Sequence, residues 1–283
     1  MGREFNLILV MARIGSSQLA FPEFRGATRR IVLANLIAFF LLLIAGFVFR
    51  DQFQFILGRL VFSPYDFLHG RIWEPLTYSF VHVGILSTFF DLLSLWFLAG
   101  FLEMQGHRSA WLMGLYITAI LASAASALVL YGVFTVIGYH PSEWPLSGTF
   151  GAIFAMLAVI GIRYGETQFL LFPLPIGIKA KYLAIIYTLV AIAMLFTSEG
   201  PYAFAQLGGG LSGLIWLNRA PSRGVGFTFS EKWYGLRNRY YRWKRRRAAR
   251  KFEVYMKSQG RTVRFDGQGR QIDDDANDKK RWN

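Results

Sequence analysis

The run Ser147-Gly148-Thr149-Phe150-Gly151-Ala152-Ile153-Phe154 places small residues within an apolar segment, residues 145–162. A second run, Ala205-Gln206-Leu207-Gly208-Gly209-Gly210-Leu211-Ser212-Gly213, lies in segment 201–217. Small residues recur every four positions in both runs and so share one face of each predicted helix. Such faces let two helix backbones approach closely in lipid. We therefore expect the two helices to pack through Gly148, Gly151, Ala152, Ala205, Gly209 and Gly213.

The composition is that of a membrane protein. Hydrophobic residues make up 54% of the chain and charged residues only 17%, against about 25% charged in soluble proteins. Segment 31–49 carries no charge, and about 20 such residues cross a bilayer as a helix. Comparable segments are residues 75–102, 110–138, 145–162, 182–197 and 201–217. The sequence thus predicts an all-α membrane protein with a bundle of six transmembrane helices.

Basic residues indicate the orientation of these helices. Residues 1–30 contain five arginines, and Arg108 and the loop 163–181 add further cations. The loops 139–144 and 198–200 contain neither lysine nor arginine. Because cytoplasmic loops are enriched in these residues, we expect both termini to be cytoplasmic. A bacterial cytoplasmic (inner) membrane is the simplest location.

The chain divides into three parts by composition. Residues 1–30 are a basic cytoplasmic N-terminal segment, residues 31–218 the membrane domain, and residues 219–283 a basic cytoplasmic tail carrying 19 of the 31 lysines and arginines. Within the tail, the pattern predicts a helix from Ser230 to about Met256, followed by a hairpin around Asp266-Gly267. This helix either binds anionic lipid headgroups or is a solvated basic helix.

The membrane domain resembles the rhomboid intramembrane proteases over about residues 30–218. The second helix carries two stretches similar to family motifs, and the two small-residue runs resemble the fourth and sixth helices of the family. The matching positions of the second helix and the start of the third are Trp73, Thr77, Phe80, His82, Gly100, Glu103, Gly106 and Tyr116. Glu74 stands where the family motif has arginine.

The resemblance assigns catalytic positions that lack catalytic side chains. The nucleophilic serine of the family falls on Phe150 and its histidine base on Gln206. A phenyl ring cannot attack a carbonyl, and an amide is no base near neutral pH. The oxyanion donors fall on Ser87 and Asp91, and an ionised Asp91 would repel an oxyanion. By resemblance, His82 is a structural hydrogen-bonding residue.

We therefore predict a rhomboid-like pseudoprotease that binds transmembrane client proteins without cleaving them, beside the second and fifth helices. Inactive relatives of this kind include the derlins and the inactive rhomboids. Phe150 would fill the space where a protease holds water. Asp91 would line a polar cavity, or be protonated and hydrogen-bonded to a neighbouring helix.

Two other functions stay open. The first is an active serine protease with Ser147 as a displaced nucleophile and His82 or His140 as its base; the simpler interpretation of Ser147 is a helix N-cap. The second is a lipid- or solute-handling protein with a polar path through Asp91.

The sequence predicts no cofactor, no metal site and no nucleic-acid partner. The chain has no cysteine, and no two of its four histidines have plausible ligand spacing with acidic residues. The tail has no recognised nucleic-acid motif. Glu103 is expected to pair with Arg108 near the end of the second helix.

Overall fold

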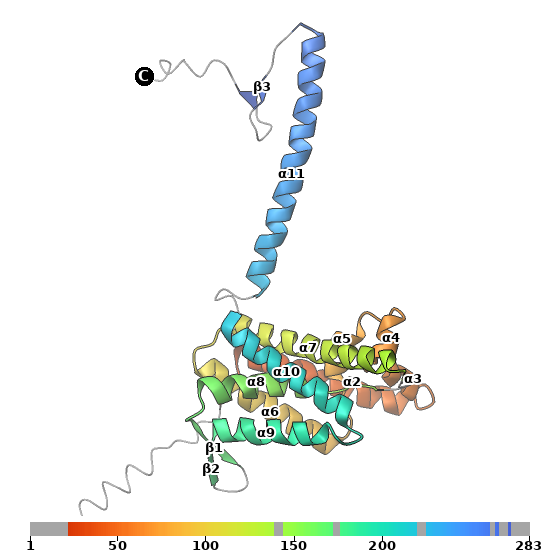
Figure 1. The fold of residues 1–283 in the computed structure, drawn as a ribbon, viewed down its shortest axis with the longest axis vertical. Helices are drawn as coiled ribbons and strands as arrows, with labels where there is room; N and C mark the ends of the chain where they lie inside the picture. Colours follow the sequence, from red (N-terminus) through yellow and green to blue (C-terminus); the bar gives the residue numbers. More distant parts are fainter. Residues whose placement is uncertain are drawn as a thin grey trace, which may run out of the picture. The chain divides into compact units, whose positions relative to one another are not determined.

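The computed structural model describes residues 22–138, 144–171, 176–219, 225–260, 264–265 and 271–272. Packing separates the chain into two units, residues 1–224 and residues 225–283. The first unit contains a bundle of roughly aligned apolar helices (Figure 1). These are α2 (Gly26–Val48), α6 (Ile85–Met104), α7 (Ser109–Val136), α8 (Phe150–Arg163), α9 (Ala180–Met194) and α10 (Gly200–Arg219).

Several of these helices are suited to a membrane. Among the described residues, α2, α6 and α7 are long and apolar enough to cross a bilayer, and α8 and α9 are shorter apolar helices. All three long helices reach or exceed the roughly 20 residues that a bilayer core requires. The protein is therefore an integral, multi-pass membrane protein.

Three predicted helix starts are wrong, and the first of these helices, α2, begins at Gly26 rather than at residue 31. The segment predicted over 75–102 becomes helical as α6 only at Ile85, after α5 (Glu74–Thr77) and the 3₁₀ turn η1 (Tyr78–Phe80). Gly84, the N-cap residue of α6, has φ of 87°, a conformation that favours glycine and lies outside the helix. The segment predicted over 145–162 likewise begins as α8 at Phe150, after Gly148 with φ of 83°.

The loop between α2 and α6 is folded. It contains α3 (Phe53–Gly58) and α4 (Pro64–Leu68) before α5. Glu74 is fully buried there, accepting the Ser63 N–H at 3.1 Å and lying 3.4 Å from the Arg71 guanidinium. Burial raises the pKa of Glu74 above its usual range, although both of these contacts oppose that rise. The carboxylate thus joins the start of α4 to the start of α5 within the loop.

Glu103 anchors the first long helix and does not pair with Arg108 as predicted. Its carboxylate accepts the Ala27 N–H at 2.8 Å and the Thr28 hydroxyl at 2.8 Å, at the first turn of α2. The Ser109 hydroxyl donates to the same carboxylate at 2.7 Å. A helix N-terminus has unpaired N–H groups and a positive dipole end. This acid therefore joins α2, α6 and α7, and Arg108 simply precedes α7.

The hydrophobic core is formed mainly by α6, α7 and α8, and α10 packs closely on α7 and α8. Strands β1 (Gln168–Leu171) and β2 (Ile176–Lys179) form an antiparallel hairpin between α8 and α9. At the edge of the bundle, α9 packs on α8 and α10, but only Ala180 and Ala191 of this helix are buried.

The second unit contains the basic helix. The helix predicted from Ser230 to about Met256 is α11 (Val225–Ser258). After it, β3 (Arg264–Phe265) pairs antiparallel with β4 (Gln271–Ile272). These strands flank the hairpin turn predicted at Asp266-Gly267, and the turn itself lies outside the described residues.

Candidate functional site

The chain enters α8 through a tightly held turn. Phe62 and Leu146 exchange two backbone hydrogen bonds of 3.0 and 2.8 Å, and the Gly148 N–H donates to the Tyr78 carbonyl at 3.0 Å. Thr149 is the N-cap residue of α8, with no capping hydrogen bond from its side chain. The N-cap role expected of Ser147 is therefore wrong. Gly148 lies in the turn, so the face expected to contain Gly148 and Ala152 is also wrong at its first position.

Small residues bring α8 and α10 together directly after this turn. A Cβ atom added to Gly209 would lie 2.6 Å from the Gly151 carbonyl oxygen and 2.6 Å from the Ser123 hydroxyl of α7. One turn on, a Cβ atom at Gly213 would lie 2.5 Å from the Ala155 carbonyl oxygen. Real Cβ atoms do not approach other atoms so closely, so glycine is required at both positions. The two backbones touch, with Ala152 and Ala205 buried beside them.

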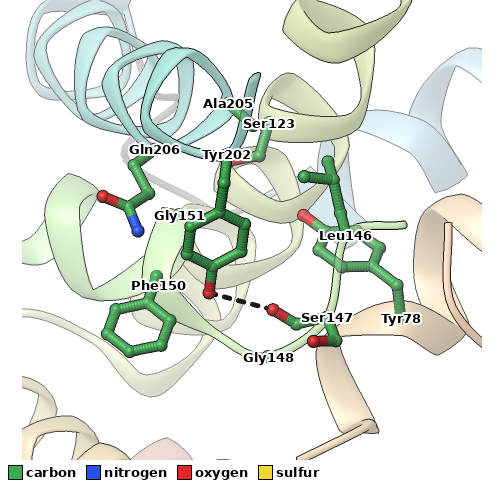
Figure 2. A pocket seen from close by; sticks show the side chains of 10 residues that line it. All are labelled: Tyr78, Ser123, Leu146, Ser147, Gly148, Phe150, Gly151, Tyr202, Ala205 and Gln206. Carbon is green, nitrogen blue, oxygen red and sulfur yellow. Dashed lines mark hydrogen bonds between the residues drawn. The ribbon is translucent and has the colours of Figure 1, made fainter. Parts of the chain in front are cut away.

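Phe150, Tyr202 and Gln206 converge beside this contact (Figure 2). Phe150 is the first residue of α8, and its ring lies edge-on to the Tyr202 ring of α10, with centroids 5.8 Å apart. The Tyr202 hydroxyl donates to the Ser147 carbonyl at 3.1 Å. Gln206 lies one helical turn after Tyr202 and is buried. This arrangement closes the turn before α8 against α10.

The space left between these side chains is small. The cavity that Phe150, Tyr202 and Gln206 line has a volume of about 10 Å³, roughly enough for one water molecule. Ser123, Ser147 and Tyr78 also border it. A cavity of this size holds no part of a peptide in the described conformation.

Asp91 approaches the same region from α6. It is buried, with 8% of its surface exposed. Ser87, one turn earlier, is exposed, and its hydroxyl donates to the Gly84 carbonyl at 3.1 Å. Of these two α6 residues, only Asp91 faces the interior.

His82 lies just before α6 and is buried. Its Nδ1 atom is 3.3 Å from the Phe80 carbonyl oxygen. Its Nε2 atom has no hydrogen-bond partner within the described part of the chain. The structure therefore shows His82 bound to its own loop rather than to a serine hydroxyl.

Comparison with known proteins gives the family. The rhomboid domain profile matches residues 69–219, more than half of the chain. The chain belongs to the rhomboid family. No curated protein sequence matches it significantly. The match begins shortly before α5 and ends with α10, so it includes every residue that lines the small cavity.

The rhomboid assignment implies descent from serine proteases. The positions that the motifs assign to the nucleophile and base, Phe150 and Gln206, line one cavity from two helices in contact. Of the two positions assigned to oxyanion donors, Asp91 is buried and Ser87 is exposed.

The motifs did not reveal Tyr202 of this rhomboid site, which packs on the Phe150 ring and hydrogen-bonds to the Ser147 carbonyl. The sequence carried one signal for it: Tyr202 precedes Gln206 by four residues, so the two share a helix face. His140, considered above as a base for Ser147, lies outside the described residues.

Proposed function

We propose that this rhomboid-family protein is a pseudoprotease that binds transmembrane helices of client proteins without cleaving them. In this proposal α2, α6, α7, α8, α9 and α10 all span the membrane, with both chain termini cytoplasmic. The observation that carries it is the aromatic filling of the site. Phe150 packs on Tyr202 and leaves room for about one water molecule.

The composition of the site supports loss of hydrolysis. A protease of this type needs a hydroxyl activated by a base within hydrogen-bond reach. Phe150 provides no hydroxyl and Gln206 no base, while the buried Asp91 would oppose a developing negative charge if ionised. Adding the missing pair alone, as Phe150→Ser with Gln206→His, should therefore not yield robust proteolysis of a single-span substrate in proteoliposomes. Efficient cleavage by this variant would contradict the proposed role of Ser87 and Asp91.

Ser147 is the other candidate nucleophile. Its carbonyl is held by Tyr202, and none of the three described histidines hydrogen-bonds to its hydroxyl. We expect a fluorophosphonate probe to leave the protein unlabelled in native membranes, with Ser147→Ala as the matched control. Labelling that disappears in Ser147→Ala would establish a serine hydrolase and overturn the proposal.

The peripheral position of α9 supports lateral client entry. This helix packs on α8 and α10 but is exposed over most of its surface. The first half of α6 is also exposed, with Phe90 more than half accessible. Weak packing in lipid allows a helix to move aside, since no hydrophobic force holds helices together there. A client helix would approach between these two elements.

Photocrosslinking in membranes tests client binding. A benzophenone amino acid at Phe90 of α6 or Ile186 of α9 should capture single-span membrane proteins. The same probe at Val129 of α7, another exposed position, should capture far fewer. Equal capture at all three positions, or none at Phe90 and Ile186, would reject the proposed entry site.

For the tail we propose that α11 binds anionic lipid headgroups. Exposed aromatic side chains such as Tyr240 and Trp243 lie among basic residues, and the Arg247 guanidinium lies 5.3 Å from the Trp243 ring. Basic helices bearing aromatic residues bind anionic interfaces. The tail should resist trypsin in phosphatidylglycerol proteoliposomes and be cleaved in phosphatidylcholine ones. Equal cleavage in both would identify a solvated helix.

A further inference from the structure

An apolar groove lies between α2 and α6, which pack on each other, and it is away from the site described above. Its volume is about 650 Å³. On α2 it is lined by Leu36, Phe39 and Phe40, and on α6 by Phe89, Leu93 and Trp96. Its polar lining residue, Thr88, donates its hydroxyl to the Gly84 carbonyl at 2.6 Å. The groove therefore presents an apolar surface to any occupant.

A cation, Arg29, lies near the start of the α2 face that lines the groove. Arg29 precedes Val32 by three residues and Leu36 by seven, and both of these line the groove, so Arg29 shares their helix face. Arg29 is exposed and forms no ion pair with another described residue. Arg25, one turn earlier, pairs with the exposed Glu23 at 2.8 Å. Charge at one end and apolar side chains beyond it match an anionic amphiphile.

The position of Arg29 favours an anionic lipid over a protein helix. From Arg29 to Phe40 the helix rises by roughly 16 Å, about half of the ~30 Å hydrocarbon core. An acyl chain whose headgroup lies at Arg29 therefore reaches the middle of the bilayer along α2. The apolar lining offers a helix no polar contact, whereas Arg29 offers a phosphate its charged donors.

We propose that the α2–α6 groove binds one anionic phospholipid, with its phosphate on Arg29 and an acyl chain between Leu36 and Leu93. The lipid belongs to the leaflet in which α2 begins. Arginine suits a phosphate because its planar donors bind two oxygens at once. This site is independent of the pseudoprotease proposal, because the groove lining includes neither Phe150 nor Gln206.

Native mass spectrometry of the full chain tests the site. Detergent-solubilised protein is titrated with phosphatidylglycerol or with phosphatidylcholine of the same acyl chains. We expect one tightly retained phosphatidylglycerol molecule per chain. Arg29→Gln should weaken its retention about tenfold, the change expected for loss of one charged contact. The control Arg30→Gln removes the same charge from the adjacent exposed position and should change retention less than twofold.

A second variant tests the chain-binding part. Leu93→Trp adds bulk to the groove at a partly exposed position, and should lower retention of phosphatidylglycerol without lowering the thermal unfolding midpoint of lipid-free protein. Three results would overturn the proposal. These are equal retention of both lipids, equal losses in Arg29→Gln and Arg30→Gln, and full displacement of phosphatidylglycerol by a single-span transmembrane peptide. The last result would assign the groove to a protein helix.

Discussion

Helices α8 and α9 are similar in length and apolar character, yet their surroundings are opposite. Most of α8 is buried, including the unbroken stretch from Gly151 to Leu157, whereas α9 buries only Ala180 and Ala191. The difference lies in the number of neighbouring helices. On α8, Gly151 and Ala155 meet the glycines of α10, and α6, α7 and α9 also pack on this helix. By contrast, α9 contacts α8 and α10 through small residues such as Ala184 and leaves Ile186 and Leu189 exposed.

This contrast shows what organises a helix bundle in lipid. Apolar side chains gain little by leaving lipid for the protein, so close backbone packing selects the neighbours. The α7–α8–α10 region therefore forms a fixed centre, in which Phe150 and Gln206 are positioned. The helix α9 remains at the edge, where a client could displace it.

The largest loss of stability should come from adding a methyl group where the backbones of α8 and α10 touch. In Gly209→Ala, the new methyl would lie 2.6 Å from the Gly151 carbonyl oxygen and 2.7 Å from its Cα atom. Backbone atoms cannot move aside cheaply, so we expect a loss of about 2–3 kcal/mol in unfolding free energy. Thermal or denaturant unfolding in micelles measures it.

The neighbouring glycine is the control. An added Cβ atom at Gly210 would lie 3.7 Å from its nearest neighbour, Phe154, which is an ordinary contact. Alanine favours a helix over glycine by about 1 kcal/mol, so Gly210→Ala should be neutral or slightly stabilising. If both variants had the same unfolding free energy, the close packing of α8 and α10 would not be what stabilises the α7–α8–α10 region.

The anchor of α2 should have the next largest effect. Glu103→Gln leaves one of the donors at Ala27, Thr28 or Ser109 facing an amide NH₂ group and removes the charge at the start of α2. Loss of a charged hydrogen bond costs about 2 kcal/mol.

The control for this anchor is Glu166→Gln. Glu166 is exposed and bonds only to the side chains of Lys179 and Lys181 among the described residues. Surface substitutions of this kind stay within about 0.5 kcal/mol. A comparable loss in both variants would show that the burial and geometry around Glu103 add nothing.

A smaller loss of stability is expected when the Tyr202 hydroxyl is removed. Tyr202→Phe keeps the ring against Phe150 but removes the hydrogen bond to the Ser147 carbonyl. The expected cost is about 1 kcal/mol of unfolding free energy. Tyr187→Phe on α9, which is about half exposed, should be neutral. An unchanged stability in Tyr202→Phe would mean that α10 does not hold the turn before α8.

The helices and the small-residue contacts were accessible to sequence reasoning because both depend on local patterns. Apolar length predicted the helices, and the spacing of Gly209 and Gly213 pointed to a close contact, which the structure has at Gly151 and Ala155. Helix starts were harder. The apolar segments begin before Gly84 and Gly148, and the positive φ values of these glycines keep the chain non-helical until α6 and α8 begin.

Long-range partners could not be predicted. Glu103 was assigned to Arg108, which is near in sequence, but its partners at Ala27 and Thr28 are more than 70 residues away. Ser87 and Asp91 were treated as a pair, yet only Asp91 is buried. One turn of helix separates them, and helix packing alone determines which of them turns inward.

The smallest effect is expected when one methyl group is removed from α8 and, for comparison, from α9. Ile160 of α8 is fully buried, so Ile160→Val leaves a cavity and should cost about 1 kcal/mol. Ile186 of α9 is about half exposed, and lipid can occupy the space left by Ile186→Val. We expect that variant to change unfolding free energy by less than about 0.3 kcal/mol in micelles, since no packed partner is lost. A cost at Ile186 equal to that at Ile160 would show that α9 is packed as firmly as α8. The displacement of α9 by a client helix would then require breaking a packed interface.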